Sequence, residues 1–222
     1  LLKLLRNSLI IAVLSSLIAT VFGTMAAVGI HSMKGRLRKA VMTMTDIPMT
    51  NPDIVTGVAL ALLFAFTGTM LKTNSILGFW TLLIAHITFN FPYVILNVMP
   101  KLQQMDPDLE EAALDLGATP MQALRKVIIP DLKSGILSGF ILAFTLSIDD
   151  FAVTLFTKGS QGLETLSTFI YADARKGGLT PELRPLMTII IFAVLILLII
   201  INIISQKNAK KYNGNDRKKI LV

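Results

Sequence analysis

Cysteine is absent from this chain of 222 residues, and histidine occurs only twice, as His31 and His86. The absence of cysteine excludes disulfides, thiol catalysis and cysteine-ligated metals. Two histidines provide too few ligands for a zinc cluster. Charged residues are also scarce, at 16% of the chain. The sequence therefore offers no constellation for an intramembrane enzyme, and we expect no catalytic residue and no metal site.

Long apolar runs are the dominant feature that is present. Apolar residues make up 53% of the chain, and they lie in near-continuous stretches close to the ~20 residues that a helix needs to cross a bilayer. The pattern predicts an all-α, polytopic transmembrane helical bundle. We expect five spans, at residues 8–30, 54–71, 77–98, 134–156 and 186–204. Residues 1–206 would form the transmembrane domain and residues 207–222 a basic tail.

The distribution of positive charge predicts the orientation of the chain. The net charge is +7, and cations are concentrated in residues 34–39, which we interpret as a loop, and in the tail. In a membrane protein such an excess marks cytoplasmic segments rather than nucleic-acid binding, so we expect no nucleic-acid partner. The C-terminal tail would lie in the cytoplasm, near anionic lipids. The amino terminus would then lie outside, which predicts one earlier span and six spans in the intact subunit.

A polar segment, residues 106–130, interrupts the apolar runs with the sequence DPDLEEAALDLGATPMQALRKVIIP. Asp106 followed by Pro107 is typical of a helix start, and Gly117 is typical of a helix end. Between them, apolar residues at helical spacing predict one apolar stripe, formed by Leu109, Ala112, Ala113 and Leu116. The segment therefore begins with a short, well-capped helix.

A second short helix is predicted directly after the first. Thr119, Pro120 and Gln122 have the spacing of a capping box with proline at the first helical position, and we expect Pro130 to end this helix. Such a hairpin could lie on the lipid headgroups or bind a protein. Its acidic cluster, formed by Asp106, Asp108, Glu110 and Glu111, disfavours an anionic membrane surface. We therefore favour a protein partner.

The polar segment resembles the EAA signature of permease subunits in bacterial ABC importers. The resemblance consists of Glu111-Ala112-Ala113, then Gly117 after three residues, then Val127-Ile128-Ile129-Pro130 after nine more. The family pattern has Ile and Leu in place of Val127 and Ile129. The resemblance implies the type I permease fold and coupling helices that insert into a cleft of an ATP-binding subunit. It assigns Glu111, Ala112, Ala113, Gly117 and Pro130 to this coupling.

Two further stretches resemble the second permease subunit of spermidine/putrescine importers: FTLSIDDFAVTLFTKG, residues 144–159, and LRNSLIIAVLSSLIATVFGTMAAVGI, residues 5–30. This resemblance implies a polyamine permease of the bacterial inner membrane. Its implied partners are a homologous second permease, two ATP-binding subunits and an extracytoplasmic polyamine-binding protein. The chain has no G-x-x-x-x-G-K-[ST] loop, so ATP and Mg would be bound by the partner subunit and no cofactor by this chain.

Two adjacent carboxylates, Asp149 and Asp150, lie inside the predicted fourth span. Each costs about 2.5–3.5 kcal/mol at the centre of a membrane helix and is a default candidate for function. Neighbouring helical positions point about 100° apart, so one would line the substrate pathway while the other bonds to a helix or to backbone. A purely structural helix cap is the alternative. Trp80 and Phe151 are candidates for cation–π contacts in the pathway, and His86 is interpreted as a satisfied interior polar residue.

Other functions remain open at this point. The chain could be an ABC permease for iron, sulfate or a small organic cation, although an anion pathway should not carry an unpaired Asp pair. It could also be a secondary transporter or channel driven by ion gradients, in which case transport would survive the loss of ATPase activity.

Overall fold

The computed structural model describes residues 2–72, 76–159 and 163–177, with scattered positions between 181 and 199. The chain divides into two compact units, Leu1–Tyr171 and Ala172–Val222. The first unit contains helices α1 to α9, and α10 (Leu166–Arg175) runs from the first unit into the second. The predicted fifth span, residues 186–204, lies largely outside the described residues, and the basic tail lies wholly outside them.

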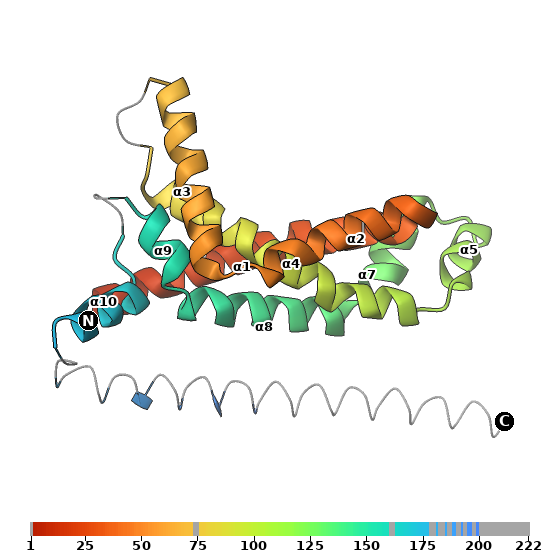
Figure 1. Ribbon diagram of the computed structural model, residues 1–222. Helices are drawn as coiled ribbons and strands as arrows, with labels where there is room; N and C mark the ends of the chain where they lie inside the picture. The colour runs from red at the N-terminus through yellow and green to blue at the C-terminus, as the bar shows by residue number, and fades with distance from the viewer. Residues whose placement is uncertain are drawn as a thin grey trace. The chain divides into compact units, whose positions relative to one another are not determined.

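Three long helices form the core of the first unit: α1 (Leu2–Ser32), α4 (Phe79–Gln104) and α8 (Lys133–Asp149) (Figure 1). Small residues allow them to approach closely. A Cβ added at Gly23 of α1 would lie 2.8 Å from the Val94 side chain, and one added at Gly139 of α8 would lie 3.4 Å from it. Val94 of α4 is fully buried between the two glycines. Close packing through small residues is how helices associate in lipid.

Two further helices, α2 (Gly35–Thr50) and α3 (Asp53–Met70), follow α1. The prediction of a basic loop at residues 34–39 was wrong, because helical backbone begins at Gly35. The chain reverses instead at Met33 and Lys34, and Gly35 takes a φ of +59° that suits glycine. Helix α3 packs on α9 (Ala152–Thr157), where a Cβ at Gly57 would lie 3.1 Å from the carbonyl oxygen of Ala152.

The described residues contain three helices that are long and apolar enough to cross a membrane: α1, α3 and α4. They coincide with the first three predicted spans. A fourth crossing is possible if the helical stretch Pro120–Asp131 and α8 form one span, bent by 68°. The predicted fourth span, residues 134–156, is not a single helix. Helix α8 ends at Asp149 and α9 begins at Ala152, because Asp150 has extended backbone with a ψ of 125°.

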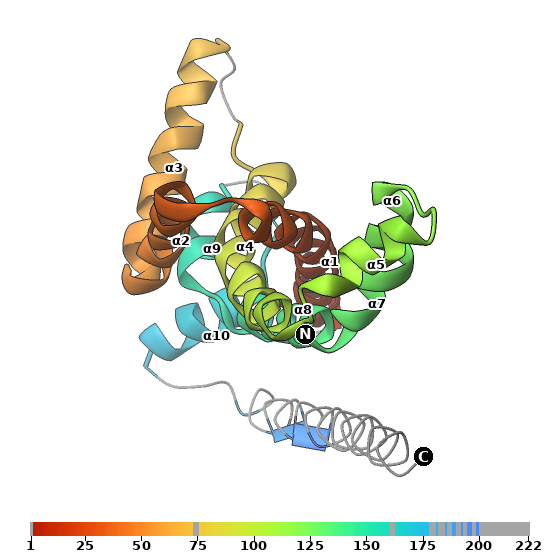
Figure 2. The same cartoon turned by 90° about the vertical axis from the view of Figure 1, so that its right-hand side faces the viewer.

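The polar segment forms four short helical pieces: α5 (Asp108–Asp115), α6 (Pro120–Ala123), the π-helical turn η1 (Leu124–Ile128) and α7 (Ile129–Asp131). These pieces group beside the end of α4 and the start of α8 (Figure 2). Helix α9 lies at the other end of α8 (Figure 1). The two regions that the sequence singles out, the polar segment and the Asp pair, therefore lie at opposite ends of the same helix.

Candidate functional site

The surface hairpin, residues 106–131, begins at a helix start that is fixed by a local hydrogen bond. The backbone N–H of Asp108 donates to Oδ1 of Asp106 at 3.0 Å. Asp106 thus satisfies one of the free N–H groups at the start of α5, as the sequence predicts. Three carboxylates in the first turn face the positive end of the helix dipole: Asp108, Glu110 and Glu111.

Two hydrogen bonds from the backbone of Gly117 and Ala118 close the C-terminal end of α5. The N–H of Ala118 donates to the carbonyl of Ala113 at 3.1 Å, and that of Gly117 donates to the carbonyl of Leu114 at 2.9 Å. This pair of bonds is the Schellman motif. Gly117 has a φ of +85°, and a Cβ added there would meet nothing within 4 Å. The backbone conformation, rather than crowding, therefore requires glycine at this position.

The second helix of the hairpin starts with the predicted capping box. The N–H of Thr119 donates to Oε1 of Gln122 at 3.0 Å, and the N–H of Gln122 donates to Oγ1 of Thr119 at 3.4 Å. Both bonds are reciprocal and local, so they need no other part of the protein to form.

Pro130 does not end this second helix, contrary to the prediction. Helical backbone continues through η1 and α7, and the chain bends only at Leu132, where ψ is −3°. The N–H of Ile129 donates to the carbonyl of Leu124, five residues back. This wider π turn accommodates a proline ring that has no N–H to donate.

The five residues that the signature assigns to coupling lie within the hairpin, and most are on its surface. Glu111, Ala112, Gly117 and Pro130 are exposed, whereas Ala113 is buried. The hairpin therefore presents two exposed small residues, Ala112 and Gly117, on a helix whose first turn is acidic. A separate protein surface of complementary shape could bind there.

The most exposed apolar side chain of the hairpin is Leu116, which is 89% exposed. It stands directly before Gly117, at the end of α5. Met121, at the start of the second helix, is 57% exposed. Sequence reasoning placed Leu116 in an apolar stripe but did not single it out. Its position at the end of a predicted helix was the sequence feature that could have indicated this exposure.

The Asp pair lies at the other end of α8 and lines a pocket of about 340 Å³. The pocket is formed where the start of α3, the middle of α4 and the break between α8 and α9 meet. Its walls combine three carboxylates with two phenyl rings and four other residues: Asp53, Asp149, Asp150, Phe89, Phe151, Pro52, Ile54, Leu146 and Ala152.

Asp150 caps α9. Its Oδ1 accepts from the N–H of Val153 at 3.1 Å, and its Oδ2 accepts from the N–H and the hydroxyl of Thr154, both at 2.9 Å. The Asp150 side chain is only 4% exposed. Its backbone carbonyl also accepts a bond of 2.6 Å from the hydroxyl of Ser167. This carboxylate thus satisfies the free donors of a helix start.

Asp149 differs from its neighbour, because it is the last residue of α8 and is exposed. Phe151 also lines the pocket, and its ring stacks on that of Tyr171 with centroids 4.6 Å apart. Trp80 lies elsewhere. It is 71% exposed at the start of α4, in edge contact with Phe79, and is not among the residues that line the pocket.

Asp53 is the pocket residue that sequence reasoning missed. It is the first residue of α3, directly after Pro52. An acidic residue at a helix start has an ordinary explanation in the helix dipole, so nothing in the local pattern linked it to residues almost a hundred positions later. The sequence feature that could have indicated its role was its position: Asp53 is a third carboxylate beside an apolar run, directly before the start of the predicted span 54–71.

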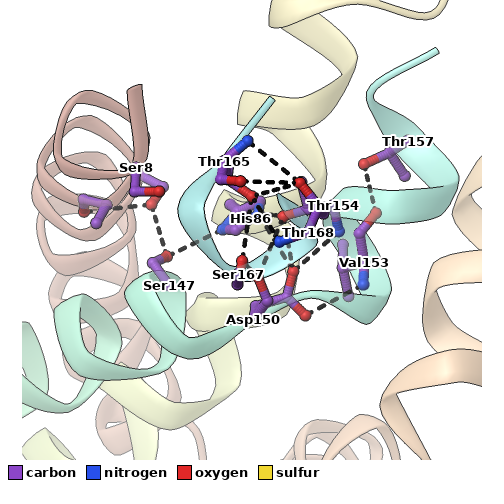
Figure 3. Close-up of polar contacts among 12 residues, drawn as sticks. Ser8, His86, Ser147, Asp150, Val153, Thr154, Thr157, Thr165, Ser167 and Thr168 are labelled. Atoms are coloured by element: carbon purple, nitrogen blue, oxygen red, sulfur yellow. Dashed lines mark hydrogen bonds and ion pairs between the residues drawn. The ribbon is translucent and has the colours of Figure 1, made fainter. Parts of the chain in front are cut away.

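Buried polar side chains of α1, α4, α8 and α9 are joined in one hydrogen-bond network next to Asp150 (Figure 3). His86 of α4 is its centre and is 1% exposed. The Nδ1 atom of His86 lies 3.1 Å from Oγ of Ser147, and its Nε2 atom lies 2.9 Å from Oγ1 of Thr154. Ser147 is bonded in turn to Ser15 of α1 at 2.9 Å and to Asn90 of α4 at 2.7 Å. The interpretation of His86 as a satisfied interior polar residue is confirmed.

Three described helices are long and apolar enough to cross a membrane, and an exposed, well-capped hairpin lies at one end of α8. The chain belongs to the family of binding-protein-dependent transport system inner membrane components, whose sequence pattern matches residues 19–213. It is a multi-pass permease of the ABC importer class and not the ATPase of such a system. Family membership confirms the resemblance noted around Glu111 and Gly117.

Curated relatives match most of the chain. The spermidine/putrescine transport system permease protein PotC of Haemophilus influenzae is 38% identical over 91% of this chain and 76% of the relative. PotC of Escherichia coli K12 is 36% identical over 97% of this chain and 78% of the relative. The putrescine transport system permease protein PotI of the same strain is 36% identical over 84% of this chain and 66% of the relative.

Solved structures support the fold. The inward-facing MetNI methionine ABC transporter contains a chain that is 21% identical, with a TM-score of 0.67 and coverage of 91% of both chains. A second match, to an amino acid ABC transporter, has a TM-score of 0.60 at 18% identity and covers 93% of this chain and 92% of that one. The helical permease fold expected from the sequence is confirmed for the described spans.

Proposed function

We propose that this chain is a permease subunit of an ATP-driven importer of polyamines such as spermidine and putrescine. Relatives that carry these names cover nearly the whole chain. The observation that carries the proposal is the pocket lined by three carboxylates and two phenyl rings. Intramembrane carboxylates are expensive and normally serve a pathway or a partner.

The pocket has the chemistry that a flexible, multiply charged amine requires. A carboxylate gives charge-assisted hydrogen bonds to an ammonium group. The faces of Phe89 and Phe151 add cation–π attraction of about 0.5–2 kcal/mol. Because a polyamine carries several ammonium groups separated by methylenes, it can bind carboxylates and apolar walls together. Sulfate would be repelled by the same walls, which disfavours that alternative cargo.

The two adjacent carboxylates would divide their work. Asp150 already accepts hydrogen bonds from Val153 and Thr154 and is almost fully buried. Asp149 is exposed at the end of α8. A passing amine would therefore bind Asp149 and Asp53 directly. Asp150 would contribute its charge from behind while it holds the wall of the pocket in place.

The surface hairpin would couple this pathway to ATP hydrolysis in a separate subunit. Its exposed residues Leu116, Gly117 and Met121 would insert into a cleft of the ATPase, with Ala112 allowing close approach. ATP and Mg would be bound by that partner. Because α8 runs from the hairpin to the pocket, a displacement of the hairpin would move the end of α8 that bears Asp149.

The complete importer would contain a homologous second permease, two ATP-binding subunits and an extracytoplasmic polyamine-binding protein. The permease would lie in the bacterial inner membrane with its C-terminal tail in the cytoplasm, near anionic lipid headgroups. In this arrangement the hairpin would lie on the cytoplasmic side, and the pocket would lie toward the outer side.

The cargo can be tested with Asp149→Asn in the complete importer, assayed by uptake of radiolabelled spermidine and putrescine. We expect uptake to fall several-fold while the subunits still co-purify, because the change removes a charge without altering size. A matched control is Asp46→Asn, in α2, which is exposed and is not among the residues that line the pocket. Normal polyamine uptake by Asp149→Asn, or equal competition by inorganic cations, would contradict the proposal.

A further inference from the structure

Donors and acceptors alone assign the direction of the hydrogen bond between His86 and Thr154. The Asp150 carboxylate can only accept, so the Thr154 hydroxyl, 2.9 Å from Oδ2, must donate its proton there. That hydroxyl has no second proton to give. The Nε2 atom of His86, at 2.9 Å from the same oxygen, must therefore be the donor of the bond between them.

The other ring nitrogen then has a defined role. In neutral imidazole with the proton on Nε2, the Nδ1 atom is an acceptor. In that state it accepts from the Ser147 hydroxyl, 3.1 Å away, and the Ser15 hydroxyl then donates to Ser147 at 2.9 Å. Ser147 in turn accepts from the side-chain amide of Asn90 at 2.7 Å. The bonds thus run in one direction, from Asn90 through Ser147, His86 and Thr154 to Asp150.

This chain of bonds joins three helices at the break between α8 and α9. Asn90 and His86 belong to α4, Ser147 to α8 and Thr154 to α9. It ends on the carboxylate that caps α9, and Nε2 of His86 itself lies 3.5 Å from Oδ2 of Asp150. The Asp150 side chain is 4% exposed, and the other members are at most 5% exposed. Water therefore cannot readily replace a missing partner, so each loss would leave a buried polar group unsatisfied.

We propose that His86 is a positioning residue for the acidic pocket: it holds Thr154 and Asp150 so that the end of α8 presents Asp149 and the negative charge of Asp150 to a cationic substrate. The residue would not bind substrate itself, because it is enclosed by protein and is not among the pocket-lining residues. This inference rests on the proposed pathway function of the pocket.

The absence of cysteine provides a direct probe of the pocket in the complete importer. Asp149→Cys places the only thiol within these 222 residues. Its rate of modification can be measured with a cationic and with a size-matched neutral methanethiosulfonate reagent, by the mass shift of this chain. In each reaction the thiolate attacks the reagent sulfur and expels sulfinate. The ratio of the two rates reports the negative charge that Asp53 and Asp150 present at this position.

The ratio is compared between the Asp149→Cys chain and the same chain with a second change. We expect the cationic reagent to react several-fold faster, and His86→Leu to reduce the ratio toward one. His86→Gln, whose amide can still donate to Thr154, should retain most of the preference. Thr154→Val should act like His86→Leu, Thr154→Ser should act like the unchanged chain, and combining His86→Leu with Thr154→Val should add nothing.

Thr88→Val is the matched control, because Thr88 lies on the same helix but is exposed and donates locally to the carbonyl of Ile84. If neither His86→Leu nor Thr154→Val changed the ratio of the two rates, the positioning role of His86 would be overturned. The proposed pathway function of the pocket would not be affected by that result. A ratio near one before any change at His86 would instead contradict the acidic pathway. If His86→Leu fails to assemble, His86→Gln and the two Thr154 variants decide the question.

Discussion

The regions at the two ends of α8 differ in how far along the sequence their hydrogen bonds reach. The surface hairpin is held by bonds between near neighbours, such as Thr119 to Gln122, three positions apart. The break at Asp150 combines local capping bonds to Val153 and Thr154 with long-range bonds, such as the one between Asn90 and Ser147, 57 positions apart. Another buried hydrogen bond spans a longer stretch of sequence: the N–H of Leu166 donates to the hydroxyl of Ser8, 158 positions away. The first end can keep its shape while it moves as one piece, whereas the second depends on how several helices are placed.

This difference suits the two proposed roles. A coupling element must transmit force to a partner without losing its own shape, and local capping provides that. A substrate pathway must change when helices move, and a network across α1, α4, α8 and α9 responds to such movement. The comparison predicts that mutations at the two ends change different measurable quantities.

The largest effect is expected at Gly117. Gly117→Val forces a β-branched residue into a φ of +85°, which costs at least ~1–2 kcal/mol or reshapes the turn. We expect uptake to fall by about tenfold or more, the equivalent of ~1.4 kcal/mol, while ATP hydrolysis continues. Gly35→Val is the control, because Gly35 has a φ of +59° but lies outside the hairpin. Equal uptake losses in both variants would remove any special role of the hairpin.

The next effect separates the two carboxylates. Asp150→Ala removes the cap of α9, and loss of an N-cap costs about 0.5–2 kcal/mol, so the melting temperature of the purified importer should fall. Asp149→Ala changes an exposed residue with an expected effect on stability within ~0.5 kcal/mol, yet it should reduce uptake. If stability and uptake changed in parallel in both variants, the assignment of a structural role to Asp150 and a substrate-binding role to Asp149 would be contradicted.

A smaller effect is expected at Ser167, whose hydroxyl donates to the Asp150 carbonyl at 2.6 Å. Ser167→Ala should destabilise the importer by about 0.5–1.5 kcal/mol, the net value of a typical hydrogen bond. Ser32→Ala removes an exposed bond within α1 and should have little effect. Thermal unfolding followed by helical circular dichroism provides the measurement. A larger loss at Ser32 would contradict the importance of the long-range contacts.

The smallest effect is expected at the capping box of the hairpin. Thr119→Ala removes one of two reciprocal bonds, but water can reach the N–H of Gln122, so the cost should be near ~0.5 kcal/mol, the low end for caps. Thr119→Ser retains the hydroxyl and should restore coupling. A slight rise in ATP consumed per polyamine in Thr119→Ala is the expected readout. No change in that quantity, even with destabilising additives, would indicate that the cap does not contribute.

The extent of successful sequence prediction follows from the same contrast. Asp106, Gly117 and Thr119 were assigned correctly because capping depends on residues within a few positions. Pro130 was misassigned because the π turn before it, which accommodates the ring, leaves no clear local pattern. The first three spans were evident from apolar length alone.

The pocket was only partly predictable. Asp149 and Asp150 were noticed because charge in an apolar run is unusual, and Phe151 was noticed as an aromatic candidate for cation–π contact. Asp53 and the partners of His86 were not, because their relation to the Asp pair exists only after α3 and α4 pack against α9. The break after Asp149 was missed because residues 151–157 are apolar enough to continue the span. The capping bonds of Asp150 show that a new helix begins there.

The most direct test of the account is the number of ATP molecules hydrolysed per polyamine imported, measured in liposomes that contain the complete importer. Gly117→Val should raise this ratio, because hydrolysis continues while its effect on the pathway is lost. Asp149→Asn should lower both rates and leave the ratio unchanged. A ratio raised by Asp149→Asn but not by Gly117→Val, or raised equally by both, would contradict the claim that one end of α8 couples and the other carries the cargo.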